Sequence, residues 1–568
     1  CFPGPRLRAA PRSPTRRQRR ARPHPRAQMT VAGKEAPSPE SWRGVAAAKP
    51  VPADGDGHVG VWPLDEHNAK LLDCVHPRGW ANPQRPSDFV YDLVAVGAGA
   101  GGLVSAKQSA RRGAKSALIE RHLAGGDCLN VGCVPSKALL RCARAVAERR
   151  RSDLGAPAAG AEGAARFAEV MERMRRLRAQ IAPVDSCETT VKAGADMYIG
   201  SASFTGPHEL TVGDRTLRFR KAVIATGARA KVPPIPGLAE APYFTNATLF
   251  NLQELPPRFA VLGAGPIGLE MAQAFRRFGA QVTVLEGLGR VLGPEDAEAA
   301  AVVHRVLEEE GVRLLTGISV QRVSHAAGEP WPEVRVSVTL PGGQEEVVAC
   351  DALLVATGRA PNVEGLGLEA AGVEFKAGLG VKVNDDLTTS NPDIFAVGDV
   401  IDRPELRFTH MSGTMAGMAV QNALFAGKGL PVNAPSALLS ELVVPRCTYT
   451  EPEVASCGLS NPEAAAARCV EVDAYTAQLD DNDRSILEGS VKGGFVRVLC
   501  RKGTDEIVGA TVVSERAGDM LAELTLAVQY RVGLSSVART VHPYPTMSEA
   551  VQQCALQFNR AHWERLDG

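Results

Sequence analysis

Apolar runs that end at glycine alternate with helical periods from residue 89 onward. Residues 89–97 (FVYDLVAVG) are apolar on both faces for most of their length, as a central strand of a parallel sheet is. Residues 101–112 have the period of a helix, and residues 116–120 (SALIE) are typical of a second strand. This order predicts an α/β unit on a parallel sheet.

The same pattern returns later in the chain. Residues 259–263, 267–278 and 281–286 repeat the strand, the helix and the second strand. The copies share three glycines and a glutamate, 166 residues apart in every case: Gly97, Gly99, Gly102 and Glu120 in the first, and Gly263, Gly265, Gly268 and Glu286 in the second. The repetition predicts two dinucleotide-binding folds in one chain.

Each glycine of such a turn has a mechanical role. The first allows the tight turn, the second lets backbone approach a pyrophosphate, and the third lets helix pack on strand. The phosphates bind at the helix N-terminus, and the glutamate accepts ribose hydroxyls. Glycine-rich turns also serve packing alone, but two flanked copies indicate two nucleotide sites. Glu286 would repel a 2′-phosphate, so we expect NADH to be preferred to NADPH, with Arg290 able to soften that preference.

A closely spaced cysteine pair follows the first glutamate. Residues 125–137 read GGDCLNVGCVPSK, and four residues separate Cys128 from Cys133. Pro135 fits the first turn of a helix expected over residues 136–150, whose N-terminal dipole would favour a thiolate at Cys133. A zinc half-site and two buried thiols are the other interpretations, but zinc would need further ligands.

Composition narrows the class of protein. The 568 residues hold 64 Lys+Arg and 63 Asp+Glu, and this near-zero net charge gives no global argument for nucleic-acid binding. Apolar residues make up 45% and charged residues 22%, as in ordinary globular domains. The most apolar stretch, residues 259–275, carries Glu270 and several glycines, so we expect no membrane span. Twelve cysteines in so long a chain indicate free thiols in a reducing compartment.

The first residues have a composition of their own. Nine arginines lie among residues 1–28, and no acidic residue precedes Glu35. Because this stretch lacks the apolar segment of a secretory signal, it predicts an organelle transit peptide, with the plastid slightly favoured over the mitochondrion. A disordered basic arm that binds anions would have the same composition. Residues 29–87 show no sustained period and are expected to form a linker and a disordered lead-in.

The run GGDCLNVGCVPSK resembles the active-site signature of the class I pyridine nucleotide-disulfide oxidoreductases, the family of dihydrolipoyl dehydrogenase, glutathione reductase and mercuric reductase. The resemblance extends from about residue 89 to residue 560. It implies an α/β flavoprotein with Rossmann-like domains for FAD and NAD(P) and a C-terminal α+β dimerisation domain. The expected boundaries are 1–87 for the leader and lead-in, 88–235 and 356–435 for the two FAD parts, 236–355 for the NAD(P) domain and 436–568 for the dimerisation domain.

The resemblance also implies roles for the site residues. Cys128 would be the interchange thiol that meets the substrate and the more exposed of the two, and Cys133 the charge-transfer thiol against the flavin. Lys137 would lie near the flavin N5 and pair with Glu270 beside the nicotinamide. The segments ATG (225–227), ATGR (356–359) and TSNPDIFAVGD (389–399) resemble the crossovers and the second FAD fingerprint. Together with the redox run they add these FAD-binding residues: Gly126, Asp127, Thr226, Gly227, Gly358 and Asp399.

Residues 541–549 (VHPYPTMSE) resemble the family's His–Glu couple, which serves the partner subunit's active site in a homodimer. His542 would move the proton between attacking and leaving thiols, with Glu549 holding the imidazole. Two local interpretations stay open. His542 could be an ordinary turn residue, and Thr546-x-x-Glu549 a capping box for a helix over residues 547–558.

The implied reaction moves electrons from NAD(P)H through FAD to a Cys128–Cys133 disulfide and then to an external disulfide, or in reverse as dihydrolipoyl dehydrogenases do. The runs VVPRCTYTEPE (443–453) and HPYPT resemble the mercuric-reductase branch more than dihydrolipoyl dehydrogenase, for which His-Ala-His-Pro-Thr is expected. Reduction of a metal ion or quinone by the same dithiol is the alternative reaction. A flavoprotein redox sensor without catalysis is the alternative from another class.

Overall fold

The computed structural model describes residues 60–150, 166–426, 437–490 and 492–566. The expected transit peptide and the expected boundary near residue 435 lie outside these residues. Within the described residues, no helix is both long enough and apolar enough to cross a membrane.

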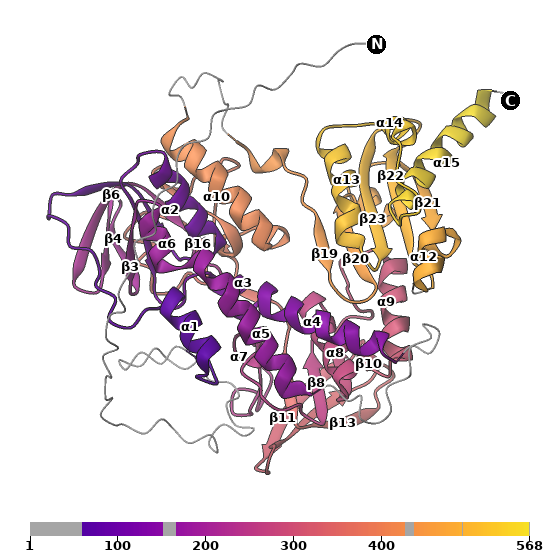
Figure 1. Cartoon of the computed structure of the whole chain (residues 1–568), viewed down its shortest axis with the longest axis horizontal. Coiled ribbons are helices and arrows are strands. Elements are labelled where there is room, and N and C mark those ends of the chain that lie inside the picture. Colours follow the sequence, from indigo (N-terminus) through magenta and orange to yellow (C-terminus); the bar gives the residue numbers. More distant parts are fainter. Residues whose placement is uncertain (1–59, 151–165, 427–436, 491, 567–568) are drawn as a thin grey trace, which may run out of the picture. The chain divides into compact units, whose positions relative to one another are not determined.

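A seven-stranded sheet carries the first nucleotide fold (Figure 1). Its order is β3-β2-β1-β6-β5-β4, with β18 beside β6, and β1, β2, β3, β6 and β18 are parallel. The strands are β1 (Val90–Val96), β2 (Ser116–Glu120), β3 (Ala195–Ile199), β4 (Ala202–Gly206), β5 (Glu209–Val212), β6 (Arg215–Ile224) and β18 (Ile394–Ala396). Because β18 pairs with β6 across more than 160 intervening residues, the chain leaves this sheet and later returns to it.

Helices from distant parts of the sequence pack with this sheet. Helix α10 lies beside α2 in Figure 1, and both contribute to the hydrophobic core under β1. The helices are α1 (Glu66–Val75), α2 (Ala100–Arg111), α3 (Gly126–Val131), α4 (Cys133–Glu148), α5 (Phe167–Ile181), α6 (Cys187–Lys192) and α10 (Thr409–Leu424).

The intervening residues form the second nucleotide fold. Its parallel sheet has the order β10-β9-β8-β14, and an antiparallel sheet β11-β12-β13 accompanies it. Phe259 of β8 stacks on Phe275 of α8 at 4.2 Å between ring centroids, which fixes the helix on the sheet. The elements are α7 (Asn246–Leu249), β8 (Arg258–Leu262), α8 (Pro266–Phe278), β9 (Gln281–Glu286), α9 (Ala297–Glu309), β10 (Arg313–Thr316), β11 (Ser319–Ala326), β12 (Glu333–Thr339), β13 (Glu345–Cys350) and β14 (Ala352–Val355).

Two short antiparallel strand pairs lie outside the larger sheets, and the strands of the first pair follow β6 and β14, where the chain leaves one nucleotide fold for the other. They are β7 (Ala228–Ala230) with β15 (Arg359–Pro361), and β16 (Phe375–Lys376) with β17 (Gly380–Val381).

The C-terminal residues form an antiparallel sheet of order β19-β20-β23-β22-β21. Helix α13 packs on β20 and β23, and α15 packs on β21 and β22. The elements are β19 (Arg446–Thr448), β20 (Glu453–Gly458), α11 (Pro462–Ala467), β21 (Val472–Gln478), α12 (Asp483–Glu488), β22 (Phe495–Arg501), β23 (Ile507–Ser514), α13 (Ala517–Gln529), α14 (Leu534–Arg539) and α15 (Glu549–Leu566). The expected fold class, two parallel nucleotide folds followed by an α+β region, is confirmed.

The expectation of a disordered lead-in is wrong for residues 60–87. Helix α1 begins after Asp65, whose side chain accepts the N–H of Asn68 at 2.9 Å, as a good N-cap does. Its buried positions are Asn68, Leu71 and Val75, so only two fully buried residues of its inner face are apolar. That is too few to reveal the helix from its hydrophobic period.

The end of this lead-in covers an edge of the first sheet. The Trp80 indole donates to the Met197 carbonyl at 3.0 Å. The Asn82 amide bonds both the N–H and the carbonyl of Ile199, at 2.8 and 2.9 Å. Both partners belong to β3, the outermost strand on that side, so the segment is held by tertiary contacts rather than by its own period.

Candidate redox and nucleotide sites

The turn between β1 and α2 is packed backbone against backbone. Gly97 has a φ of +100°, and a Cβ there would lie 2.4 Å from the Ala225 carbonyl oxygen. A Cβ on Gly102 would lie 1.7 Å from the Gly97 oxygen. Gly99 is the N-cap of α2, and a Cβ there would meet nothing nearer than Gly126, at 3.9 Å. The space before the first N–H groups of α2 therefore fits a pyrophosphate.

The second copy repeats this geometry. Gly263 has a φ of +107°, and its Cβ would lie 2.6 Å from the Ala356 oxygen. A Cβ on Gly268 would lie 2.1 Å from the Gly263 oxygen, and one on Gly265 would meet nothing within 4 Å. The outer two glycines are thus required for packing, and the middle one leaves room for a ligand.

The glutamate after the second strand is fixed in the same way in both copies. It accepts two backbone N–H groups, from Ala98 (2.6 Å) and His122 (2.8 Å) for Glu120, and from Ala264 (2.6 Å) and Leu288 (2.7 Å) for Glu286. Each oxygen keeps a further lone pair, so both carboxylates can accept ribose hydroxyls. Burial raises the pKa of the Glu120 carboxyl, and its backbone bonds oppose that shift.

Arg359 joins two of the implied FAD residues. Its guanidinium donates to Asp127, at the start of α3, to Asp399 at 3.1 Å, and to the Ala228 carbonyl. Burial raises the pKa of the Asp399 carboxyl, and Arg359 opposes that shift. The arginine therefore brings the redox run and the second FAD fingerprint together.

The two crossover segments also pair with each other. The Thr226 hydroxyl donates to the Asn362 carbonyl at 2.8 Å, and the Asn362 amide donates back to the Thr226 carbonyl at 2.9 Å. Gly227 and Gly358, with φ of +67° and +115°, turn the chain into β7 and β15. These predicted residues lie beside the first nucleotide fold, as a shared FAD cradle requires.

The cysteines lie on two consecutive helices. Cys128 belongs to α3, and Cys133 is the first residue of α4, which begins three residues earlier than predicted. A Cβ on Gly132 would lie 2.7 Å from the Asp127 oxygen, so glycine allows the close approach between the two helices. Both thiols are free.

The surroundings of the two sulfurs make them unequal. A hydrogen bond from the Cys128 thiol lowers the pKa of Cys133 to about 6 against the effect of burial, and Thr409 and Lys137 add to the lowering. The Thr409 hydroxyl lies 3.3 Å from the Cys133 sulfur. The same thiol–thiol bond raises the pKa of Cys128. Cys133 is therefore the thiolate of the pair.

The exposure of the two thiols in the protein itself differs from the expected order. Cys133 is exposed and Cys128 half-buried. The expectation concerns a Cys133 that lies against the flavin, so it stays a prediction for the FAD-bound protein. Their charge, not their exposure, distinguishes the two thiols.

Lys137 and Glu270 meet beside Cys133. The Lys137 ammonium lies 2.9 Å from a Glu270 carboxylate oxygen, and the other oxygen accepts the Tyr449 N–H at 3.0 Å. The ammonium also lies 4.3 Å from the centroid of the Tyr449 ring. The predicted Lys137–Glu270 ion pair is thus present. It joins α4 to α8 and contacts Tyr449, the residue that follows β19.

Two residues beside this ion pair and Cys133, Tyr449 and Thr409, were not predicted as site residues. Tyr449 lies within the quoted run VVPRCTYTEPE, so the resemblance was the available signal. Thr409 opens α10 outside the motifs that the sequence analysis used.

The expected pairing of His542 with Glu549 is wrong in this chain. The imidazole Nε2 lies 3.0 Å from a carboxylate oxygen of Glu523, on α13, and Nδ1 lies 3.0 Å from the Thr540 carbonyl. The His542 side chain is only 5% exposed, and its role toward a partner subunit stays a prediction. A carboxylate on the adjacent helix satisfies the ring without Glu549.

Tyr544 is the exposed group of this segment. Its hydroxyl donates to Asp483 at 2.6 Å, and this bond, with a smaller effect from the nearby Glu549 carboxylate, raises the pKa of Tyr544. Glu549 opens α15, and the Thr546 hydroxyl donates to the Pro543 carbonyl, so the capping box is not formed. The side chain near Glu549 is therefore the phenol of Tyr544, not the imidazole of His542.

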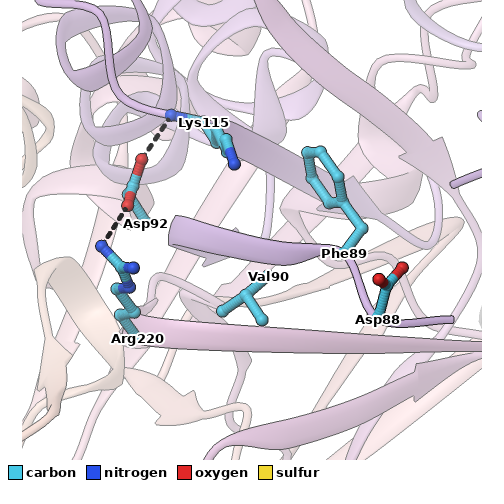
Figure 2. Close-up of a pocket in the computed structure, with 6 residues that line it drawn as sticks. All are labelled: Asp88, Phe89, Val90, Asp92, Lys115 and Arg220. Atoms are coloured by element: carbon cyan, nitrogen blue, oxygen red, sulfur yellow. Dashed lines mark hydrogen bonds and ion pairs between the residues drawn. The ribbon is translucent and has the colours of Figure 1, made fainter. Parts of the chain in front are cut away.

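A hollow lined by charged residues lies at the opposite end of the first sheet (Figure 2). Its lining residues are Asp88, Phe89, Val90, Asp92, Lys115 and Arg220. Asp92 bridges the Lys115 backbone N–H at 2.9 Å and the Arg220 guanidinium at 3.2 Å, which offsets its charge. The hollow lies where β1 and β2 begin, away from Gly97 and Glu120, and holds no redox group.

Possible metal ligands form no cluster within the described residues. Among those residues, no three His, Cys, Asp or Glu side chains are close enough to hold an ion.

Comparisons with known proteins agree with this geometry. Residues 91–426 match the family model described as pyridine nucleotide-disulphide oxidoreductase, and residues 444–555 match its dimerisation domain. Mercuric reductase of Staphylococcus aureus is 33% identical over 530 residues, covering 91% of this chain and 93% of that protein. Dihydrolipoyl dehydrogenase of Thermus scotoductus is 34% identical over 473 residues, covering 82% and 96%.

A solved structure has the same fold. It is the copper(II) complex of the HOCl-induced flavoprotein disulfide reductase RclA from Escherichia coli. It superposes with a TM-score of 0.71 at 26% identity, covering 83% of this chain and 99% of that one. With two family models covering both nucleotide folds and the C-terminal sheet, the chain belongs to the pyridine nucleotide-disulphide oxidoreductases and is a homodimeric FAD flavoprotein.

Proposed function

We propose that this oxidoreductase uses NADH to reduce an external disulfide through Cys128 and Cys133. The observation that carries the proposal is the polarised thiol pair, in which Cys133 is the thiolate and Cys128 its hydrogen-bond donor, beside the Lys137–Glu270 ion pair. The net reaction converts NADH, a proton and a disulfide into NAD⁺ and two thiols. The arginine-rich composition of residues 1–28 supports action in an organelle, with the plastid slightly favoured.

The chain's own residues would divide the work. Gly99 leaves the backbone open to the FAD pyrophosphate, while Gly97 and Gly126 allow the close backbone packing around it. Glu120 would accept the FAD ribose, and Asp399 its ribityl chain. When bound, FAD supplies two-electron transfer between nicotinamide and thiols. Lys137 keeps positive charge beside Cys133, which favours its thiolate over the thiol.

Reduction of a metal ion by the same dithiol is the second candidate. Relatives named mercuric reductase support it, and so does the solved structure of RclA, which is a copper(II) complex. The C-terminal segment offers the exposed phenol of Tyr544 in place of an imidazole. A phenol with a raised pKa stays protonated near neutral pH and cannot accept a proton from an attacking thiol, whereas binding a soft metal ion to thiolates requires no such base.

Turnover with a panel of acceptors tests the proposal. The FAD-loaded dimer is given NADH with lipoamide, glutathione disulfide, a small aromatic disulfide, mercury(II) or a quinone. A disulfide should give the highest kcat/KM, and Cys128→Ser should abolish that turnover. If only mercury(II) or quinone is reduced, the disulfide assignment is wrong. If no acceptor is reduced by a chain that holds FAD, the non-catalytic sensor is favoured.

Cofactor choice follows from Glu286. Its carboxylate would repel a 2′-phosphate, and Arg290 donates instead to the carbonyls of Gly293 (2.6 Å) and Glu295 (3.0 Å). We therefore expect kcat/KM to favour NADH over NADPH by about tenfold or more. Glu286→Ala should narrow the ratio, as measured by initial rates with both nucleotides. A tenfold advantage for NADPH in the unaltered chain would contradict this assignment.

A further inference from the structure

Helix α1, which precedes the first strand of the nucleotide fold, contacts the segment that joins Glu120 to the redox cysteines. The Val75 carbonyl, at the end of α1, accepts the Ala124 N–H at 3.0 Å. The ring of the next residue, His76, bonds the His122 carbonyl. The segment from Glu120 to Cys128 therefore rests on α1 at two points.

A buried guanidinium carries a third contact from α1 to the redox helix. Arg178, on α5, is 1% exposed. One of its terminal nitrogens donates to the Asn68 side-chain oxygen at 2.7 Å, and the other donates to the Asn130 carbonyl at 2.6 Å. Asn68 belongs to α1 and Asn130 to α3, so Arg178 joins the two helices through the protein interior.

Asn130 also bonds the residues that precede Cys128. Its side-chain amide donates to the carbonyls of Ala124 and Gly126, at 3.0 and 2.9 Å. Residue 126 is the first of α3, and Cys128 lies in that first turn. Both ends of this short helix are thus fixed by one residue, whose own carbonyl is held by Arg178.

We infer that α1 positions the redox helix: the Asn68–Arg178–Asn130 link holds α3, and with it Cys128, against Cys133. Asn68 and Arg178 are positioning residues, since neither lies against the thiols. A short helix of six residues has little stability of its own, so its place depends on such tertiary contacts. The inference rests on the proposed roles of the two thiols.

The state of Cys133 reports the position of α3. The groups that face its sulfur are the Cys128 thiol from α3, Thr409 from α10, Lys137 from α4, Glu270 from α8 and the Tyr449 ring. Of these, the Cys128 hydrogen bond has the largest effect on the pKa. A displaced α3 would weaken that bond and raise the pKa of Cys133.

A matched pair of substitutions on α1 tests the inference. Asn68→Ala removes the α1 acceptor of Arg178. Asp65→Asn removes the charge at the N-cap of α1 that pairs with Arg175 of α5 at 2.5 Å, while asparagine keeps the cap. Both should lower Tm, but only the first breaks the link to α3.

The readout is the pH titration of the long-wavelength charge-transfer absorbance in the two-electron-reduced, FAD-loaded dimer. The unaltered chain should titrate near pH 6. Asn68→Ala should shift the midpoint upward by about half a unit or more, and Asp65→Asn should leave it unchanged. Should Asn68→Ala fail to fold, Arg178→Lys keeps the charge but loses the fork that reaches both partners, and the same upward shift is expected.

Two outcomes separate this inference from the proposed function. Equal midpoints in the unaltered chain and in Asn68→Ala, or equal shifts in Asn68→Ala and Asp65→Asn, would overturn the positioning role alone. Absence of any charge-transfer absorbance in the unaltered, FAD-loaded chain would instead overturn the assigned roles of the thiols.

Discussion

Replacing Cys133 by serine is expected to abolish both the long-wavelength charge-transfer absorbance and turnover with a disulfide. The absorbance needs a thiolate, and Cys133 is the sulfur whose pKa is lowered to about 6. Turnover should fall by about 10⁴-fold or more, the scale on which loss of one member of a covalent catalytic unit is measured. FAD content should stay unchanged, because the contacts of the FAD cradle do not depend on this sulfur. Stopped-flow spectra and steady-state rates measure these effects.

Cys128→Ser is the matched control. It should also lose disulfide turnover, since a single sulfur cannot resolve a mixed disulfide. The serine hydroxyl still donates a hydrogen bond to Cys133, so the charge-transfer absorbance should persist. The absorbance should disappear as the pH falls through about 6, because protonation removes the thiolate. If Cys128→Ser loses the band and Cys133→Ser keeps it, the two roles are reversed.

Gly268→Ala should disrupt the second nucleotide fold, and Gly265→Ala should leave it intact but impair NADH binding. A Cβ on Gly268 would lie 2.1 Å from the Gly263 oxygen. That oxygen cannot withdraw, since Gly263 itself lies against the Ala356 carbonyl. Overpacking of this kind costs about 1–3 kcal/mol, which calorimetry should detect as a Tm lower by at least about 3 °C.

The contrasting glycine isolates the ligand effect. A Cβ on Gly265 meets nothing within 4 Å, and its φ of −78° suits alanine. The methyl group would occupy the approach to the N-terminus of α8, so KM for NADH should rise about tenfold with little change in Tm. An unchanged KM in Gly265→Ala would place the nicotinamide cofactor elsewhere. An unchanged Tm in Gly268→Ala would contradict the close packing of this turn.

The two nucleotide folds were predictable because their signals are local. Their backbone geometry accepts only a few residue types at certain positions. These are the glycines of the turns, the apolar residues of the buried strands, and the glutamates at 120 and 286. The bounds of β2 and β9 agree with the prediction to the residue. The Lys137–Glu270 pair, 133 residues apart, was available only through the family resemblance.

The errors fall where tertiary contacts decide the outcome. Helix α1 has two fully buried apolar residues on its inner face, and buried polar bonds to α5 replace the missing hydrophobic period. His542 was expected to pair with Glu549, but its ring bonds Glu523 on α13, and nothing near residue 542 in sequence indicates that helix. Helix α3, which carries Cys128, was not predicted, because its six residues are too few for a periodic pattern.

The cover over β3 has a consequence for self-association. The outermost strand of a parallel sheet presents unpaired N–H and carbonyl groups that can recruit a strand from another molecule. Here the Asn82 amide acts in place of a neighbouring strand at Ile199, and the Trp80 indole occupies the Met197 carbonyl. A second copy therefore finds these backbone groups already occupied. Strand-to-strand aggregation at this edge is therefore suppressed.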